Sequence, residues 1–131
     1  MIGLDTNVLV RYLVEDDPDQ TARAAELIYD ALDADDRLFL PEIVLCEVVW
    51  VLQSAYRLPR QRIVEVLRDL LRTRQLAVEQ PESARRALDR YAEGSADFAD
   101  YLILDRCRAA GCDRVASFDT GLQAEEGVFP P

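Results

Sequence analysis

The sequence predicts an α/β fold in which a mostly parallel sheet of about four or five short strands has helices on both faces. Short apolar segments alternate with amphipathic helical patterns along the 131 residues, which we expect to form a single domain over residues 1–131. An Asp-Thr pair follows an apolar segment twice, at Asp5-Thr6 and at Asp119-Thr120. Because right-handed crossovers bring the carboxyl ends of parallel strands to one edge, we expect Asp5 and Asp119 to share that edge.

The chain begins with an apolar segment that stops at Asp5-Thr6-Asn7, after which apolar residues resume at Val8 and Leu9. This pattern predicts a short buried strand that leads into a helix. Asp5 then lies at the carboxyl end of a strand, where sites are built in parallel α/β sheets. The alternative is that Asp5 only caps the helix that it precedes.

The middle of the chain alternates helices and strands. Pro18 suits a helix start, and an amphipathic helix is expected over residues 21–32. Strands are expected at 38–40 and 75–80, and helices at 42–52, 60–72 and from 81 to about 92. Gly111 ends a further helix that runs from Asp97, and the chain closes with strands at 114–118 and around 128–129.

Glu47 is the one carboxylate in a segment that is otherwise apolar from Ile43 to Leu52. A helix that is apolar on all sides is buried, and a buried unpaired carboxylate costs several kcal/mol. We therefore expect Glu47 to be buried and either paired with an arginine or part of a functional site. Asp97 and Asp100 are three residues apart, so they share one face of a helix at its N-terminus. Acids in a first turn also stabilise a helix through its dipole.

Histidine and lysine are both absent, and all 15 basic residues are arginine. Their absence excludes imidazole zinc sites, histidine bases, the P-loop and Schiff-base chemistry. The three cysteines have no Cys-x-x-Cys spacing and are expected to be buried free thiols. Catalysis would therefore depend on carboxylates, hydroxyls, arginine and bound ions.

The formal net charge of −10 argues against a nucleic-acid partner, but the charges are unevenly distributed. Acids concentrate in two surface segments, at 15–19 and 33–36, whereas arginines cluster elsewhere, so a basic rim can surround an acidic centre. No apolar segment approaches the length of a membrane span, and no charged leader precedes one. We expect a cytoplasmic protein without membrane contact.

Four or five carboxylates at one edge of a sheet would repel one another unless a cation lay between them. Oxygen ligands without histidine or paired cysteine suit a hard ion, Mg²⁺ or Mn²⁺. Sites of this kind usually serve phosphoryl chemistry, because the ion offsets charge that develops on the leaving oxygen.

Four segments, in this order, carry a family resemblance: Ile-Gly-Leu-Asp5-Thr-Asn-Val-Leu, Val-Leu-Cys-Glu47-Val-Val, Asp97-Phe-Ala-Asp100 and Ser117-Phe-Asp119. They resemble the four acidic motifs of PIN-domain ribonucleases, and more specifically those of the VapC toxins of type II toxin–antitoxin systems. The resemblance implies a Mg²⁺- or Mn²⁺-dependent endonuclease that cuts RNA, forms a homodimer and is inhibited by a small VapB-like antitoxin. The helix pair 43–72 would then take part in dimer and antitoxin contacts.

Carried over residue by residue, the resemblance implies a set of acidic catalytic and metal-binding residues: Asp5, Glu47, Asp100 and Asp119, with Asp97 as an accessory metal ligand. Thr6 and Asn7 match positions that form hydrogen bonds around the first acid. Ser117 stands where the family often has threonine, and serine retains the hydroxyl group. No acid of the pattern is missing.

Two other functions remain open from the sequence. A non-catalytic PIN-type interaction module would be indicated by loss of an acid, which is not observed. A metal-dependent phosphatase-like α/β enzyme shares the acidic pocket, but that class uses a lysine, and Asn7 replaces its second acid.

Overall fold

The computed structural model describes residues 1–131 and divides into two compact units, Met1–Pro81 and Glu82–Pro131. The expected single domain over residues 1–131 stays a prediction. All strand pairs are parallel, and helices connect most of the strands, so the predicted α/β fold class is confirmed. The strands form one sheet of three strands and one of two.

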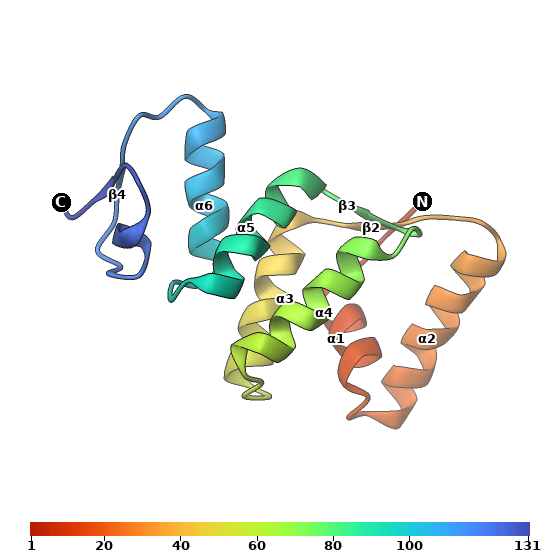
Figure 1. Ribbon diagram of the computed structural model, residues 1–131. Helices are drawn as coiled ribbons and strands as arrows, with labels where there is room; N and C mark the ends of the chain where they lie inside the picture. Colours follow the sequence, from red (N-terminus) through yellow and green to blue (C-terminus); the bar gives the residue numbers. More distant parts are fainter. The chain divides into compact units, whose positions relative to one another are not determined.

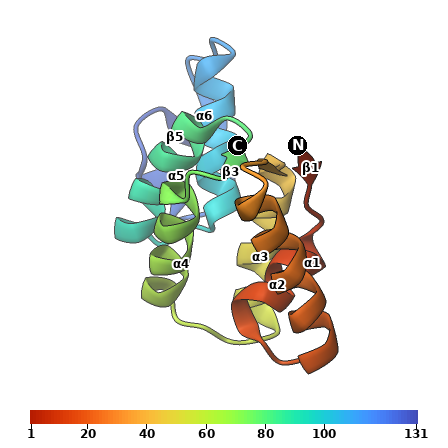
Figure 2. The ribbon, with the colours of Figure 1, turned by 90° about the vertical axis from the view of Figure 1, so that its right-hand side faces the viewer.

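The first unit contains the sheet β1-β2-β3, made of Ile2–Gly3, Leu38–Leu40 and Leu76–Val78. Leu38 pairs with Ile2 on one side and with Leu76 on the other. Two helices connect each pair of consecutive strands: α1 (Thr6–Val14) and α2 (Pro18–Asp33), then α3 (Glu42–Ser54) and α4 (Arg60–Arg72). Helices α1 and α2 lie side by side in both views (Figures 1 and 2).

The core of the first unit forms where apolar helix faces meet the sheet. Leu38 and Leu40 of β2 have no exposed surface, and neither have Val48 of α3 and Ile63 of α4. Each such side chain contributes about 1.5–3 kcal/mol through removal from water. Because β2 is the central strand, its carboxyl end is fixed firmly, and so is the start of α3 that follows it.

Helix α2 begins at Pro18, earlier than the amphipathic pattern over 21–32 suggests. Pro18 has no N–H to leave unpaired at this position, and the Asp17 carboxylate accepts a hydrogen bond of 3.1 Å from the Gln20 N–H. The predicted helix at 60–72 and strand at 75–80 are confirmed, the strand being shorter.

The burial expected for Glu47 is wrong, because its side chain is exposed. Ile43 and Trp50, which lie four residues before and three residues after it, are both 67% exposed. These spacings place all three on one helix face, which in this structure is open although it is largely apolar. Apolar composition on all sides therefore did not imply burial on all sides.

The second unit contains α5 (from Pro81 to Glu93), α6 (Phe98–Ala109), the 3₁₀ turn Leu122–Ala124 and the strand pair β4 (Val115–Ala116) and β5 (Val128–Phe129). Tyr91 and Phe98 pack edge to face, with ring centroids 6.0 Å apart, and both are buried. This contact joins α5 to the start of α6, where two of the candidate acids lie.

The three cysteines are free, as expected, but Cys112 is exposed and the other two are half-buried, so the prediction of buried thiols is wrong. None of the helices combines the length and the hydrophobicity that crossing a membrane would need.

Candidate functional site

Asp5 follows β1 and caps α1. It therefore occupies the predicted position at the end of a strand and also has the alternative role of a helix cap. Its backbone is extended, and its side-chain oxygen accepts a hydrogen bond of 2.8 Å from the Thr6 N–H. The cap uses one carboxylate oxygen, and the side chain is exposed. Capping therefore leaves Asp5 free to bind a further group.

The hydroxyl of Thr6 is buried beside this cap and has no hydrogen-bond partner. The residue is only 5% exposed. A buried hydroxyl without a partner costs free energy, so Thr6 holds an unsatisfied polar atom at the start of α1. Asn7 follows it on the first turn of α1 and is exposed.

Asp97 and Asp100 lie at the start of α6, as the spacing predicts. The Asp97 N–H donates a hydrogen bond of 3.2 Å to the Asp100 carboxylate. Burial raises the pKa of Asp100 above its usual value, and the negative charges of Asp119 and Asp97 raise it further. Asp100 is therefore a carboxylate whose charge the surrounding structure disfavours and which a cation would stabilise.

Asp119 lies in a tight turn after β4. Its N–H donates to the Ser117 hydroxyl at 3.1 Å, and its carboxylate accepts from the Leu122 N–H at 2.8 Å. A Cβ added to Gly121 would lie 2.8 Å from the Ala96 nitrogen. The turn that bears Asp119 thus packs directly against the loop that leads into Asp97.

The second unit therefore brings Asp97, Asp100 and Asp119 into electrostatic contact, whereas Asp5 and Glu47 belong to the first unit. No group of three or more acidic, histidine or cysteine side chains is arranged so that it could hold a metal ion. The assignment of these residues as catalytic and metal-binding stays a prediction.

The sequence reasoning missed a second charged cluster, on the facing sides of α5 and α6. Arg86 donates two hydrogen bonds, of 2.7 and 3.0 Å, to Asp105, whose side chain is 7% exposed. Arg86 and Arg106 both donate to the hydroxyl of Ser83, which is buried. The signal was the spacing of Asp105, four residues after buried Tyr101, which places an acid on the buried face of α6.

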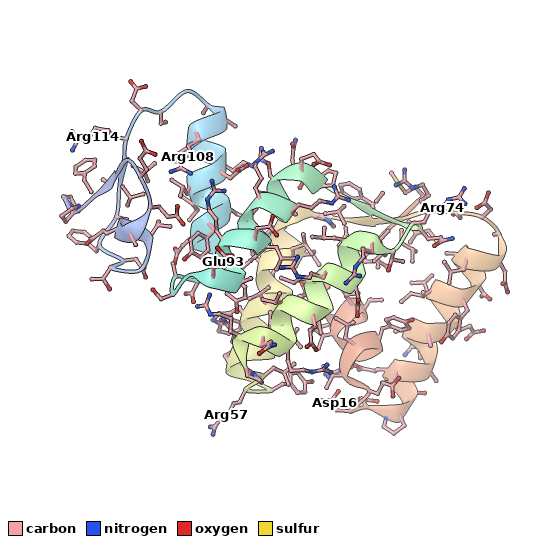
Figure 3. All side chains as sticks on the ribbon, viewed as in Figure 1. Asp16, Arg57, Arg74, Glu93, Arg108 and Arg114 are labelled. Atoms are coloured by element: carbon pink, nitrogen blue, oxygen red, sulfur yellow. The ribbon has the colours of Figure 1, made fainter.

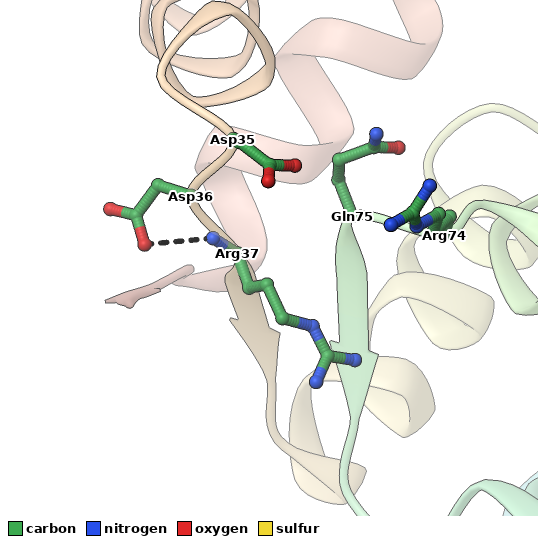
Figure 4. Close-up of a pocket in the computed structure, with 5 residues that line it drawn as sticks. All are labelled: Asp35, Asp36, Arg37, Arg74 and Gln75. Atoms are coloured by element: carbon green, nitrogen blue, oxygen red, sulfur yellow. Dashed lines mark hydrogen bonds between the residues drawn. The ribbon is translucent and has the colours of Figure 1, made fainter.

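The clefts of the first unit include two of similar volume. One, of about 410 Å³, lies at the amino-terminal ends of β2 and β3 and is lined by Asp35, Asp36, Arg37, Arg74 and Gln75. Figure 4 shows the Asp36 carboxylate bonded to the Arg37 N–H while the Arg37 guanidinium points away from it. The other cleft, of about 430 Å³, lies between α1 and α2, and Asn7 is among its lining residues. Only the second adjoins a candidate site residue.

Comparison with known proteins finds a matching family model and a similar protein. The family model described as "PIN domain" matches residues 2–125. A protein of Aquifex aeolicus (strain VF5) named "VapC ribonuclease" is 29% identical over 116 residues, which cover 88% of this chain and 84% of that protein. The range that the family model matches includes all four acidic segments.

Proposed function

Because the chain belongs to the PIN-domain family, we propose that it is a metal-dependent endoribonuclease that hydrolyses RNA phosphodiester bonds, as a toxin restrained by an antitoxin. The supporting observation is the match over residues 2–125, within which Asp5, Glu47, Asp100 and Asp119 follow one another in the order of the family's acidic motifs. The similar protein of Aquifex aeolicus is named a ribonuclease, which supports the same reaction class.

We assign Mg²⁺ or Mn²⁺ as the cofactor, with the carboxylates of Asp5, Glu47, Asp97, Asp100 and Asp119 as its ligands. Three observations fit a cation: the donor set is all oxygen, the Thr6 hydroxyl beside Asp5 is buried without a partner, and burial and neighbouring charge disfavour ionised Asp100. When bound, the ion would polarise a phosphoryl oxygen and offset the charge that develops on the leaving oxygen.

The chain's own residues have positioning roles in this proposal. The capped position of Asp5 fixes one carboxylate oxygen toward α1 and leaves the other for the site. Asp119 is held in a similar way. Its N–H donates to the Ser117 hydroxyl, and the Leu122 N–H donates to its carboxylate and orients it. Both acids are thereby held before substrate arrives, which lowers the cost of assembling the reactive geometry.

We further propose that the chain forms a homodimer and binds a VapB-like antitoxin, with the helix pair 43–72 in these contacts. Ile43 and Trp50 are large, exposed and on one face of α3, which is the kind of surface that protein contacts bury. Sedimentation velocity tests the oligomeric state: we expect a dimer at micromolar concentration, and a monomer with and without antitoxin would contradict this part.

Cleavage of a structured RNA by the purified chain tests the main proposal. We expect cleavage with Mg²⁺ or Mn²⁺, none with a chelator, and none by Asp119→Asn. Asp113→Asn, an identical change at an exposed aspartate of the same unit, is the matched control and should cleave like the wild type. Binding without cleavage under all these conditions would favour the non-catalytic interaction module instead.

A further inference from the structure

The cleft between α1 and α2 differs from two other clefts in the charge of its lining. Its lining residues are Asn7, Val8, Arg11, Gln20, Arg23, Ala24 and Leu27. Two are cationic and none is acidic, in a chain whose formal net charge is −10. The cleft at Arg37 and the one along α5 both contain carboxylates in their lining.

Position links this cleft to the candidate site. Asn7 lines the cleft and is two residues after Asp5 at the start of the same helix, so the cleft opens within one helical turn of the first acid. The end of the cleft lined by Asn7 is therefore the part nearest to a phosphate held at Asp5.

Arg11 is held in place on this side of α1. Its Nε donates to Gln20 at 2.6 Å, and its Nη1 donates to Asp16 at 2.9 Å and to the Tyr56 hydroxyl at 3.1 Å. These bonds use Nε and Nη1 and leave the N–H groups of Nη2 for a ligand. A guanidinium fixed in this way loses little conformational entropy when it binds an anion.

Arg23 is the weakly paired cation of the cleft. Its side chain is 77% exposed, and its one ion pair, with Asp19, is 3.9 Å long. An exposed pair of that length contributes almost nothing, so the guanidinium can move from Asp19 to a phosphate at little cost. Ala24, which is buried, and the half-buried Val8 and Leu27 supply the apolar part of the lining.

We propose that this cleft binds the RNA nucleotide next to the cleaved phosphodiester, with Arg11 and Arg23 contacting its phosphate and Val8 and Leu27 contacting its sugar or base. The proposal rests on the proposed function, because the place of the nucleotide is defined by cleavage at Asp5. Cations beside apolar surface and a volume of about 430 Å³ match a nucleotide in both chemistry and size.

Binding of a fluorescein-labelled structured RNA, measured by anisotropy, tests the proposal. The measurement uses the full chain carrying Asp5→Asn in Mg²⁺, so that the RNA stays intact. Adding Arg23→Glu should weaken binding about tenfold or more, through loss of one cation and gain of one anion. Arg57→Glu is the matched control, since Arg57 is exposed, forms no ion pair and points away from the ribbon in Figure 3; it should change binding less than threefold.

The salt dependence of binding separates contact with phosphate from a structural role. Arg23→Ala should reduce the slope of log K against log salt concentration by about one, whereas Arg57→Ala should leave it unchanged. Leu27→Ala should weaken RNA binding without changing the slope, because it removes apolar contact and no charge.

Equal weakening by the Arg23 and Arg57 variants, or an unchanged salt slope for Arg23→Ala, would overturn the inference. So would variants that bind RNA normally but lose a peptide antitoxin, since the cleft would then be a peptide site. The cleavage assay tests the proposed function separately. If the wild-type chain cleaves no RNA, the cleavage proposal is contradicted, whatever the binding of the Arg23 and Arg57 variants shows.

Discussion

The N–H of Asp97 donates a hydrogen bond of 3.2 Å to the carboxylate of Asp100, which closes the first turn of α6 around an acid that the structure holds partly out of water. The loop that precedes Asp97, at Ser95 and Ala96, packs against Gly121, which lies in the turn that bears Asp119. One short helix start and one tight turn thus bring the charges of Asp97 and Asp119 near Asp100, where both disfavour its ionised form.

Replacement of Asp100 by asparagine should separate activity from stability. If Asp100 is a metal ligand, as proposed, RNA cleavage should fall about 10–100-fold or more. The free energy of unfolding without metal should stay the same or rise, because a partly buried charge that Asp119 and Asp97 disfavour is lost. Chemical denaturation and cleavage assays, with Asp113→Asn as control, measure both, and a large loss of stability would mean that Asp100 is structural.

Divalent metal should stabilise the folded chain. At a metal concentration ~100 times the dissociation constant, binding to the folded state alone adds about 2.7 kcal/mol. The melting temperature should therefore rise with Mg²⁺ or Mn²⁺ at millimolar concentration, and the rise should disappear in Asp5→Asn. An identical rise in the wild type and the variant would point to binding elsewhere on this acidic chain.

Gly121→Ala should separate the two loops of the second unit. An added Cβ would lie 2.6 Å from the Ser95 hydroxyl oxygen and 2.8 Å from the Ala96 nitrogen. The Ala96 nitrogen is a backbone atom, so the clash is relieved only if one of the two loops moves. We expect a loss of stability of about 1–3 kcal/mol and reduced cleavage, because Asp119 moves relative to Asp97. Gly3→Ala, where nothing lies within 4 Å, is the control in the same urea titration. Equal stability of the two variants would contradict this packing.

Asp105→Asn should destabilise the chain in a pH-dependent way. The hydrogen bonds from Arg86 lower the pKa of Asp105 in the folded state. The ion pair therefore contributes stability above the ordinary aspartate pKa, near ~4, and this contribution is lost as the pH falls through the lower folded value. We expect the variant to lose about 1–3 kcal/mol at neutral pH and little in strong acid. A difference that does not vary with pH would show that charge is not involved.

The alternation of short apolar segments and amphipathic patterns was sufficient to predict the strand and helix order, because each pattern reports one buried face. Glu47 shows the limit of that reasoning. Composition indicated a buried helix, but the face shared by Ile43, Glu47 and Trp50 is exposed in the structure. Burial depends on which neighbours cover a face, and the sequence of α3 alone carries no information about them.

The candidate site was predictable only in part, for a similar reason. Asp5 and Asp119 were identifiable because each follows an apolar strand segment. The unpartnered hydroxyl of Thr6 and the pairing of Arg86 with Asp105 required coordinates, because they depend on contacts between segments far apart or on the direction of one side chain. Spacing along α6 could have indicated that Asp105 faces inward, but could not have identified its partner.

The most direct test of the central claim is the sequencing of RNA ends after controlled expression of the wild type, Asp5→Asn and Asp33→Asn. Asp33 is an exposed aspartate at the end of α2, so its replacement is a matched control. We predict new RNA ends at defined positions with the wild type and with Asp33→Asn, and none with Asp5→Asn. The same ends with Asp5→Asn, or no new ends with the wild type, would contradict the proposal that these carboxylates cleave RNA.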